Sequence, residues 1–147
     1  MKKIITFLML MTVSLMTFSQ QNFLVFGDSL SVTVDSLKAR GLFVTDVFPQ
    51  ETWMTCCGKD FVVREKPDGM QVIAEYRTPE VMTTECITQV WREAVNELKE
   101  KYQIIYVTEK FNVNGDFCFS GAFKEDAFKV SVAVQRDGEI VITYTQW

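Results

Sequence analysis

Ser29 has the residue type of a catalytic nucleophile and lies in the run from Phe26 to Ser31, which reads FGDSLS. A serine hydroxyl is a weak nucleophile. It attacks an ester only when a neighbouring base accepts its proton and a third group orients that base. Histidine serves most often as that base, and the chain contains none. The residues themselves therefore offer a nucleophile without the partner that would activate it.

The same six residues resemble the nucleophile block of the GDSL esterase and lipase family. The resemblance implies that Ser29 would attack an ester, flanked by Gly27 and Asp28. The family also carries an Asp-x-x-His block and a Gly-x-Asn-Asp block. The first is absent, and Asn114-Gly115-Asp116 has the residues of the second in another order. We therefore expect a chance match without catalysis, in which Asp28 or Ser29 caps a helix.

Four cysteines, Cys56, Cys57, Cys86 and Cys118, are disulfide candidates. An even number in an exported protein permits disulfides, with three pairings of four. Cys56 and Cys57 would point to opposite faces on a strand and would then need different partners. The alternative is that some are buried free thiols. With no histidine and no CxxC spacing, we expect neither a metal site nor a cofactor.

Aromatic side chains could form a binding surface. Phe117, Phe119 and Phe123 alternate with other residues along a predicted strand, and such a face could bind a protein or an apolar ligand. The same alternation is typical of a strand face that points into the core, which we favour. Trp53 and Trp147 lie near predicted strand ends and are candidate anchors for a partner.

Acidic residues show no paired spacing on one element that would suggest general acid–base chemistry. We assign the four most prominent to solvated faces and turns: Glu65, Glu75, Asp126 and Asp137.

The elements of the first half begin with a helix predicted from Leu30 to Arg40, because Leu30, Val34 and Leu37 recur at helical spacing and Gly41 follows. Strands are then predicted over 42–48, 52–57, 61–65 and 70–77. The last two are joined by a turn at Lys66-Pro67-Asp68-Gly69.

The second half repeats this order. An apolar stripe predicts a helix from about Thr84 to Tyr102, with a start near Pro79 as the alternative. Strands are predicted over 104–109, 117–124, 128–135 and 139–145, with a hairpin turn at Arg136-Asp137-Gly138.

Residues 28–77 and 84–146 are thus candidate repeats. Leu37 and Leu98 mark the two helices, 61 residues apart, and Gly69 and Gly138 mark the two turns, 69 residues apart. The predicted fold class is α+β. It comprises an antiparallel sheet with two helices packed on one face, built from tandem α-β-β-β units.

Residues 1–19 are predicted to be a secretion signal, with a positive start at Lys2-Lys3, a short apolar run and a small-residue exit. Residues 20–147 then form one secreted or periplasmic domain, without membrane insertion after signal removal. The net charge is −4, and loss of the two lysines makes it −6. An acidic body without a basic cluster repels nucleic acids and anionic lipid surfaces.

The layout of helix, strands and Asp-Gly hairpin, present twice, is similar to the family of β-lactamase-inhibitor-protein-like domains. That resemblance implies binding or inhibition of another protein through the sheet face. We therefore expect an exported, non-catalytic module whose partner is a protein in the cell envelope or outside the cell. A carrier of small apolar ligands is the alternative, and an esterase using Ser29 is the less favoured one.

Overall fold

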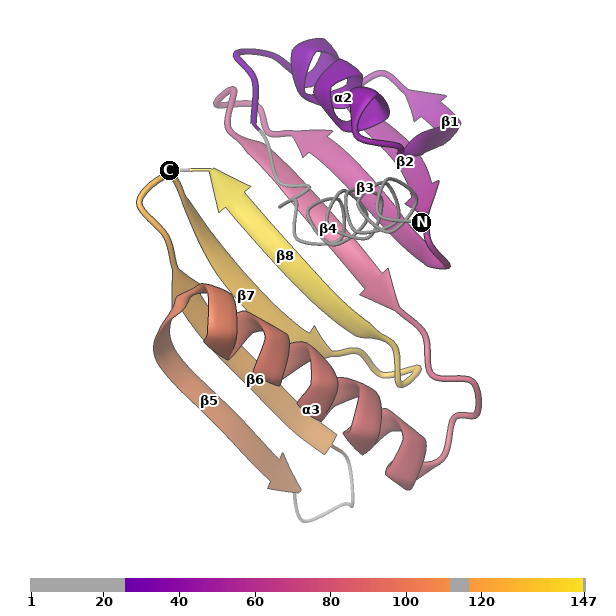
Figure 1. Cartoon of the computed structure of the whole chain (residues 1–147), viewed down its shortest axis with the longest axis vertical. Helices are drawn as coiled ribbons and strands as arrows, with labels where there is room; N and C mark the ends of the chain where they lie inside the picture. Colours follow the sequence, from indigo (N-terminus) through magenta and orange to yellow (C-terminus); the bar gives the residue numbers. More distant parts are fainter. Residues whose placement is uncertain (1–25, 112–116, 147) are drawn as a thin grey trace, which may run out of the picture.

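The computed structural model describes the backbone of residues 26–111 and 117–146. The side chains of residues 111, 117 and 118 are not part of this description. The predicted signal at 1–19, the side chains of Phe117 and Cys118, and Trp147 therefore lie outside the described part. Within it, two helices and an eight-stranded antiparallel sheet confirm the predicted α+β class (Figure 1).

Each half contains one helix followed by four strands. The four strands agree with the ranges predicted for each half, and the α-β-β-β unit proposed from them was one strand too short. The first half contains α2 (Leu30–Ala39), β1 (Phe43–Phe48), β2 (Glu51–Cys56), β3 (Lys59–Glu65) and β4 (Gln71–Arg77). The second half contains α3 (Thr84–Lys101), β5 (Gln103–Phe111), β6 (Phe117–Lys124), β7 (Phe128–Val134) and β8 (Ile140–Gln146). A turn of two residues joins β1 to β2, so these two strands form a hairpin at the edge of the sheet.

Both helices begin at the predicted residue and end one residue before the predicted end. The Ser29 hydroxyl caps α2, and the Thr83 hydroxyl caps α3 by accepting a hydrogen bond from the backbone of Cys86 at 3.3 Å. At the other end of α2, Gly41 has a φ of +99°, a conformation that glycine adopts at little cost. Helix α3 starts at Thr84, so Pro79 lies outside it.

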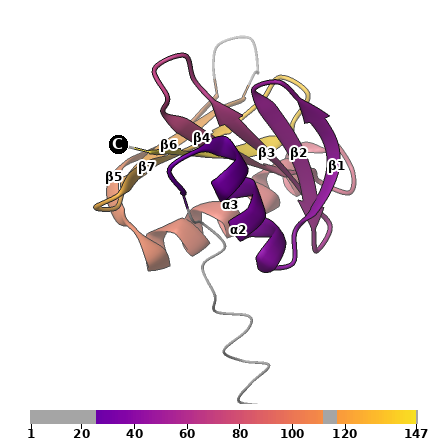
Figure 2. The same cartoon turned by 90° about the horizontal axis from the view of Figure 1, so that it is seen from above.

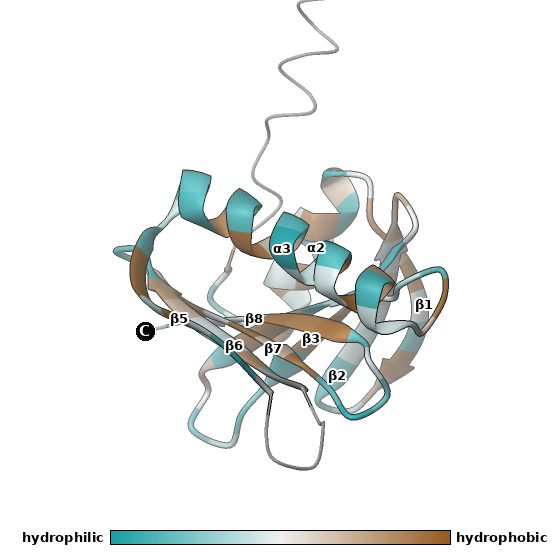
Figure 3. Cartoon of the chain, turned by 90° about the horizontal axis from the view of Figure 1, so that it is seen from below, coloured by the Kyte–Doolittle hydropathy of each residue, from teal (hydrophilic) through white to brown (hydrophobic). Residues whose placement is uncertain are grey.

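The strand order is β1-β2-β3-β4-β8-β7-β6-β5, so the last strand of each half meets the other at the centre of the sheet. Both helices lie on the same side of this sheet (Figure 3), and Figure 2 shows the sheet curving around them. The outer strands β1 and β5 form its two free edges.

The pairing of the strands repeats along the chain. Residues 51–77 pair among themselves in the same register as residues 120–146, which lie 69 positions later. Where the halves meet, Ala74 pairs with Thr143, also 69 positions later. An approximate two-fold axis therefore passes between Ala74 and Thr143 and exchanges the two halves.

Irregular features repeat as well. A bulge interrupts β1 between Val44 and Asp46, and another interrupts β5 between Ile104 and Tyr106. Bulges bend and twist a strand at one place, so matching bulges give both sheet edges the same local shape.

The β3–β4 and β7–β8 turns have the same hydrogen bonds. In each, an aspartate carboxylate accepts from the backbone N–H two residues later, at 2.9 Å for Asp68 and 3.0 Å for Asp137. The glycine that follows, Gly69 or Gly138, has a φ of +83° or +88°. These are the two turns that the Asp-Gly pairs predict.

A single apolar core lies between the helices and the sheet and draws on both halves. Trp91 of α3 is fully buried at its centre and stacks on Phe119 with 5.2 Å between ring centroids. The predicted stripe of α3 is buried except for Val90, which is half-buried. Packing of this stripe on the sheet supplies most of the stability of the helix.

Candidate functional site

Ser29 is a helix cap in the structure. Its Oγ accepts a hydrogen bond from the Val32 N–H at 3.4 Å and contacts the Ser31 hydroxyl at 3.1 Å. Gly27 also has a structural role, because a Cβ there would lie 2.4 Å from Cγ1 of Val32. The Gly27 carbonyl accepts from the Gln71 side chain at 2.7 Å, which ties this segment to β4. Local folding thus accounts for the FGDSLS run.

Phe119 and Phe123 are buried beneath α3, with 3% and 0% of their surfaces exposed. This burial corrects the alternative prediction that the alternating phenylalanines form a binding face. Phe119 and Phe123 point into the core, where no partner can reach them. Trp53 remains on the surface as a half-buried side chain of β2.

The cysteines differ from the expectation in one respect. Cys57 does not continue β2 but lies in the turn after it, with a φ of +57°. Its sulfur lies 3.0 Å from that of Cys56, so the two thiols meet instead of facing apart. Cys56, Cys57 and the half-buried Cys86 of α3 are free thiols.

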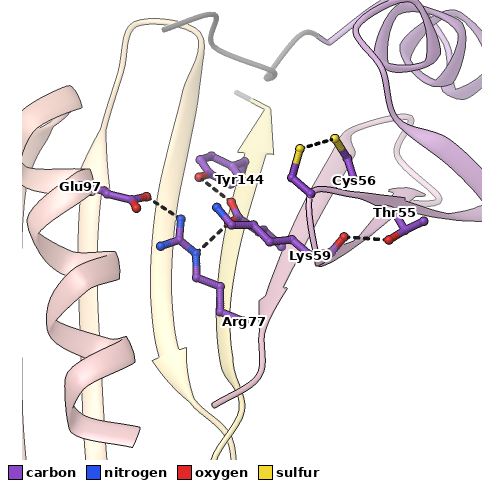
Figure 4. Close-up of polar contacts among 8 residues, drawn as sticks. Thr55, Cys56, Lys59, Arg77, Glu97 and Tyr144 are labelled. Atoms are coloured by element: carbon purple, nitrogen blue, oxygen red, sulfur yellow. Dashed lines mark hydrogen bonds and ion pairs between the residues drawn. The ribbon is translucent and has the colours of Figure 1, made fainter. Parts of the chain in front are cut away.

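Glu75 is the most deeply buried charged side chain that the structure describes, although the sequence assigned it to a solvated face. It lies on β4 two residues after Ile73, which belongs to the core beneath the helices. Because alternate residues of a strand share a face, Glu75 is on the helix side of the sheet. The guanidinium of Arg77 binds its carboxylate at 2.7 Å, and the Lys59 ammonium contacts it at 3.3 Å (Figure 4).

Two further side chains extend this cluster into the second half of the chain. Arg77 also donates to Glu97 of α3 at 2.6 Å. The Tyr144 hydroxyl of β8 donates to the other oxygen of Glu75 at 3.5 Å. Glu75 and Tyr144 are 69 positions apart, so they occupy equivalent places beside the two-fold axis and contact each other across it.

The cluster of Lys59, Glu75, Arg77, Glu97 and Tyr144 is electrostatically balanced. Burial alone would lower the pKa of the Arg77 guanidinium, but its bonds to Glu97 and Glu75 raise it above its ordinary value. Burial would raise the pKa of Glu97, and the hydrogen bond and charge of Arg77 outweigh it, so the pKa is lowered. Burial, followed by the charge of Glu75, raises the pKa of Tyr144 well above its ordinary value, so its hydroxyl stays protonated.

This arrangement holds elements together rather than offering a reactive group. Two cations offset two carboxylates, and each charge has a partner within the cluster. No buried side-chain nitrogen or oxygen among the described residues lacks a hydrogen-bond partner. We interpret the cluster as a clamp that joins β3, β4, β8 and α3 at the junction of the halves.

The opposite face of the sheet is not covered by either helix. Trp53 and Tyr76 stack there with ring centroids 6.1 Å apart and planes 12° from parallel. Three small apolar side chains, Val62, Ala74 and Val141, lie beneath them.

Arg64 of β3 completes this surface, which we call the aromatic patch: Trp53, Arg64 and Tyr76. Glu51 orients two of the three patch residues. Its carboxylate accepts a hydrogen bond from the Arg64 guanidinium and another from the Trp53 indole, each at 2.5 Å. The hydrogen bond from Arg64, then that from Trp53, lowers the pKa of Glu51.

Sequence reasoning found Trp53 but missed its companions. The period-two pattern of β2, β3 and β4 places Trp53, Arg64 and Tyr76 on one face once the register is known. Register depends on which residues pair across strands, and the sequence alone left that open. The same reason explains why the burial of Glu75 was missed.

Comparisons with known protein families, curated proteins and solved structures found no match. Neither helix in the described ranges combines the length and hydrophobicity needed to cross a membrane. Residues 26–111 and 117–146, so far as their side chains are described, contain no group of three or more histidine, cysteine or acidic residues placed to hold a metal ion.

Proposed function

We propose that the chain is an exported, non-catalytic module that binds another protein through the aromatic patch. The observation that carries this proposal is the orientation of Trp53, Arg64 and Tyr76 on a sheet face that neither α2 nor α3 covers. Tryptophan, tyrosine and arginine are the residues most enriched where binding energy concentrates in protein interfaces.

The patch is ordered before any partner arrives. The Glu51 carboxylate holds both the Arg64 guanidinium and the Trp53 indole, and Tyr76 stacks on the indole. Side chains that are already held in place lose less conformational entropy on binding, and this raises affinity for a given contact area. An arginine with an aromatic surface beside it also suits an acidic or aromatic group on the partner.

The repeated register supports a duplicated architecture, which we infer arose from two copies of one helix-and-four-strand unit. The resemblance to β-lactamase-inhibitor-protein-like domains was inferred from the sequence on this order of elements, and it implies protein binding through the sheet face. Export is supported by the positive, apolar and small-residue segments of residues 1–19.

A carrier of apolar ligands is supported less well. Its pocket would be lined by the core aromatics, but these pack on one another: Trp91 on Phe119, and Phe128 on Tyr102 and Tyr144, at centroid distances of 5.2 to 6.1 Å. An esterase would need a base beside Ser29, and backbone capping already occupies that hydroxyl.

The test is quantitative capture of cell-envelope proteins, with the wild type and the variants Trp53→Ala and Tyr76→Ala compared by mass spectrometry. We expect one envelope protein to be retained by the wild type and reduced at least tenfold with either variant, since loss of such a residue costs at least about 2 kcal/mol of binding. Equal retention by all three proteins would contradict the patch as the contact surface.

A matched control is Tyr106→Ala, which removes an exposed tyrosine from β5 at the far edge of the sheet. It should retain the partner as the wild type does. Circular dichroism must show that each variant is folded. Titration with a hydrophobic reporter dye separates the carrier alternative, because a saturable stoichiometric site in the folded protein would favour it.

A further inference from the structure

The turn between β2 and β3 consists of two residues, Cys57 and Gly58, between the paired Cys56 and Lys59. Both turn residues have positive φ, +57° and +75°, as the tight type I′ hairpin turn requires. Asparagine, aspartate and glycine are the usual residues at such positions, and a cysteine there is uncommon. The position of Cys57 therefore calls for an explanation other than turn preference.

This turn brings two thiols together at the tip of the hairpin. The sulfurs of Cys56 and Cys57 lie 3.0 Å apart, which is about 1 Å from disulfide bonding distance (Figure 4). The Cys57 side chain is exposed and the Cys56 side chain is half-buried. The hydrogen bond to Cys57, and then burial, raise the pKa of the Cys56 thiol.

We propose that Cys56 and Cys57 form a two-electron redox site, which closes a disulfide between neighbouring residues when it reacts with a disulfide of a small thiol such as oxidised glutathione. The exposed Cys57 meets the oxidant, and Cys56 lies behind it in position to complete the reaction. Cys56 packs against the core on the helix side of the sheet, whereas Trp53 and Tyr76 lie on the other face. The redox proposal does not depend on the proposed binding function.

The reaction proceeds in two exchanges. The Cys57 thiolate attacks one sulfur of the oxidant, forms a mixed disulfide and releases one small thiolate. The Cys56 thiolate then attacks the Cys57 sulfur, closes the Cys56–Cys57 bond and releases the second small thiolate. The two protons of the cysteine thiols end on the two released thiols. Two electrons reduce the oxidant, and the protein loses two hydrogens.

The bond formed this way should be easily reduced again. Neighbouring Cα atoms are about 3.8 Å apart across a trans peptide, whereas disulfides usually join Cα atoms at least about 4.4 Å apart. The ring is therefore strained, and strained, exposed disulfides are the labile ones. Its place at a hairpin tip suits reversible oxidation better than permanent cross-linking.

The experiment uses the protein with Cys86→Ser and Cys118→Ser, so that only Cys56 and Cys57 remain. The reduced, folded protein is mixed with oxidised glutathione, quenched with a maleimide and weighed intact. We expect the oxidised protein to weigh two hydrogens less than the reduced protein, with no maleimide and no glutathione attached. Brief treatment with reduced glutathione should then restore two thiols that react with the maleimide. Peptide mapping should place the bond between residues 56 and 57.

The comparison variant adds Cys56→Ser, which leaves Cys57 without a second thiol. Its mixed disulfide with glutathione should persist at least tenfold longer than that of the two-thiol protein. Circular dichroism before and after oxidation shows whether the fold is retained. The proposal fails if the two-thiol protein keeps one or two glutathiones, forms a dimer through intermolecular disulfides, or takes maleimide at both cysteines after oxidation.

Discussion

Arg77 is the residue on which the centre of the molecule depends. It is only 12% exposed, and its guanidinium joins Glu75 on its own strand to Glu97 on α3. A buried guanidinium is tolerated only when it is paired and hydrogen-bonded, so these carboxylates must stay ionised for the arrangement to hold. The clamp therefore ties the position of α3 to the charge of Glu97, its partner on that helix.

The substitution Glu97→Gln should reduce stability in a pH-dependent way. The pKa of Glu97 is lower in the folded protein, so its contribution is full above the ordinary carboxyl pKa of about 4.3 and disappears as pH falls through the folded value. Because Glu97 is about half exposed, we expect a loss of about 0.5–1 kcal/mol at pH 7. Urea unfolding at pH values from 7 to 3 should show the difference from wild type shrinking towards zero.

Glu93→Gln is the control for this measurement. It makes the same chemical change on the same helix, but Glu93 is exposed and its carboxylate accepts a hydrogen bond from the uncharged Gln89. Its unfolding midpoint should follow that of the wild type at every pH. A constant difference between Glu97→Gln and wild type across this range would show that the charge of Glu97 has no part in the clamp.

At the scale of elements, the β3–β4 and β7–β8 turns have the same hydrogen bonds but different packing around their glycines. A Cβ at Gly69 would meet no atom within 4 Å. A Cβ at Gly138 would lie 2.7 Å from Cδ1 of Ile87 and 3.1 Å from the sulfur of Met82. The β7–β8 turn therefore packs under the start of α3, while the β3–β4 turn is open.

Gly69→Ala and Gly138→Ala form a matched pair. Both impose the strain of a positive φ on alanine, about 1–2 kcal/mol. Only the second also forces Ile87 to move, which adds about 1–3 kcal/mol of overpacking. Chemical denaturation should show Gly138→Ala to be the less stable protein by at least about 1 kcal/mol. Equal stabilities would mean that the side chains of Ile87 and Met82 move aside at little cost.

The elements themselves could be predicted closely. The sequence placed both helices and all eight strands within a few residues, because apolar spacing, caps and turn residues are local signals. The end of β2 was missed by one residue: Cys57 was taken as a strand residue and lies in the turn. Positive φ at a cysteine is atypical of turn preferences, so no local signal marked it.

At the scale of the whole molecule, the two halves share one core and one central strand pair. Residues of α2, α3 and strands from both halves belong to the same buried cluster. β4 and β8 pair along six residues, and the Arg77–Glu97 and Glu75–Tyr144 contacts cross the junction. Neither half can bury its part of the sheet centre without the other.

We therefore expect the halves to unfold together. Trp53 reports on the first half and Trp91 on the second. Two variants are needed, each keeping one of these tryptophans and carrying phenylalanine in place of the other two. The fluorescence of each variant then follows the unfolding of one half. In each protein, the fluorescence transition in urea should coincide with the far-ultraviolet circular dichroism transition. If Trp53 fluorescence changes at lower urea than the circular dichroism of the same protein, the first half unfolds independently.

The sequence by itself determined the helices, the strands, their turns and the repeated order of elements, because each depends on residues close together in the chain. Only the tertiary structure decided which strands meet at the centre, that Glu75 is buried beside Tyr144, and that Trp53, Arg64 and Tyr76 share an uncovered face. It also decided that the Cys56 and Cys57 sulfurs meet. These features depend on register and on one backbone angle, and neither is encoded in the spacing of residue types.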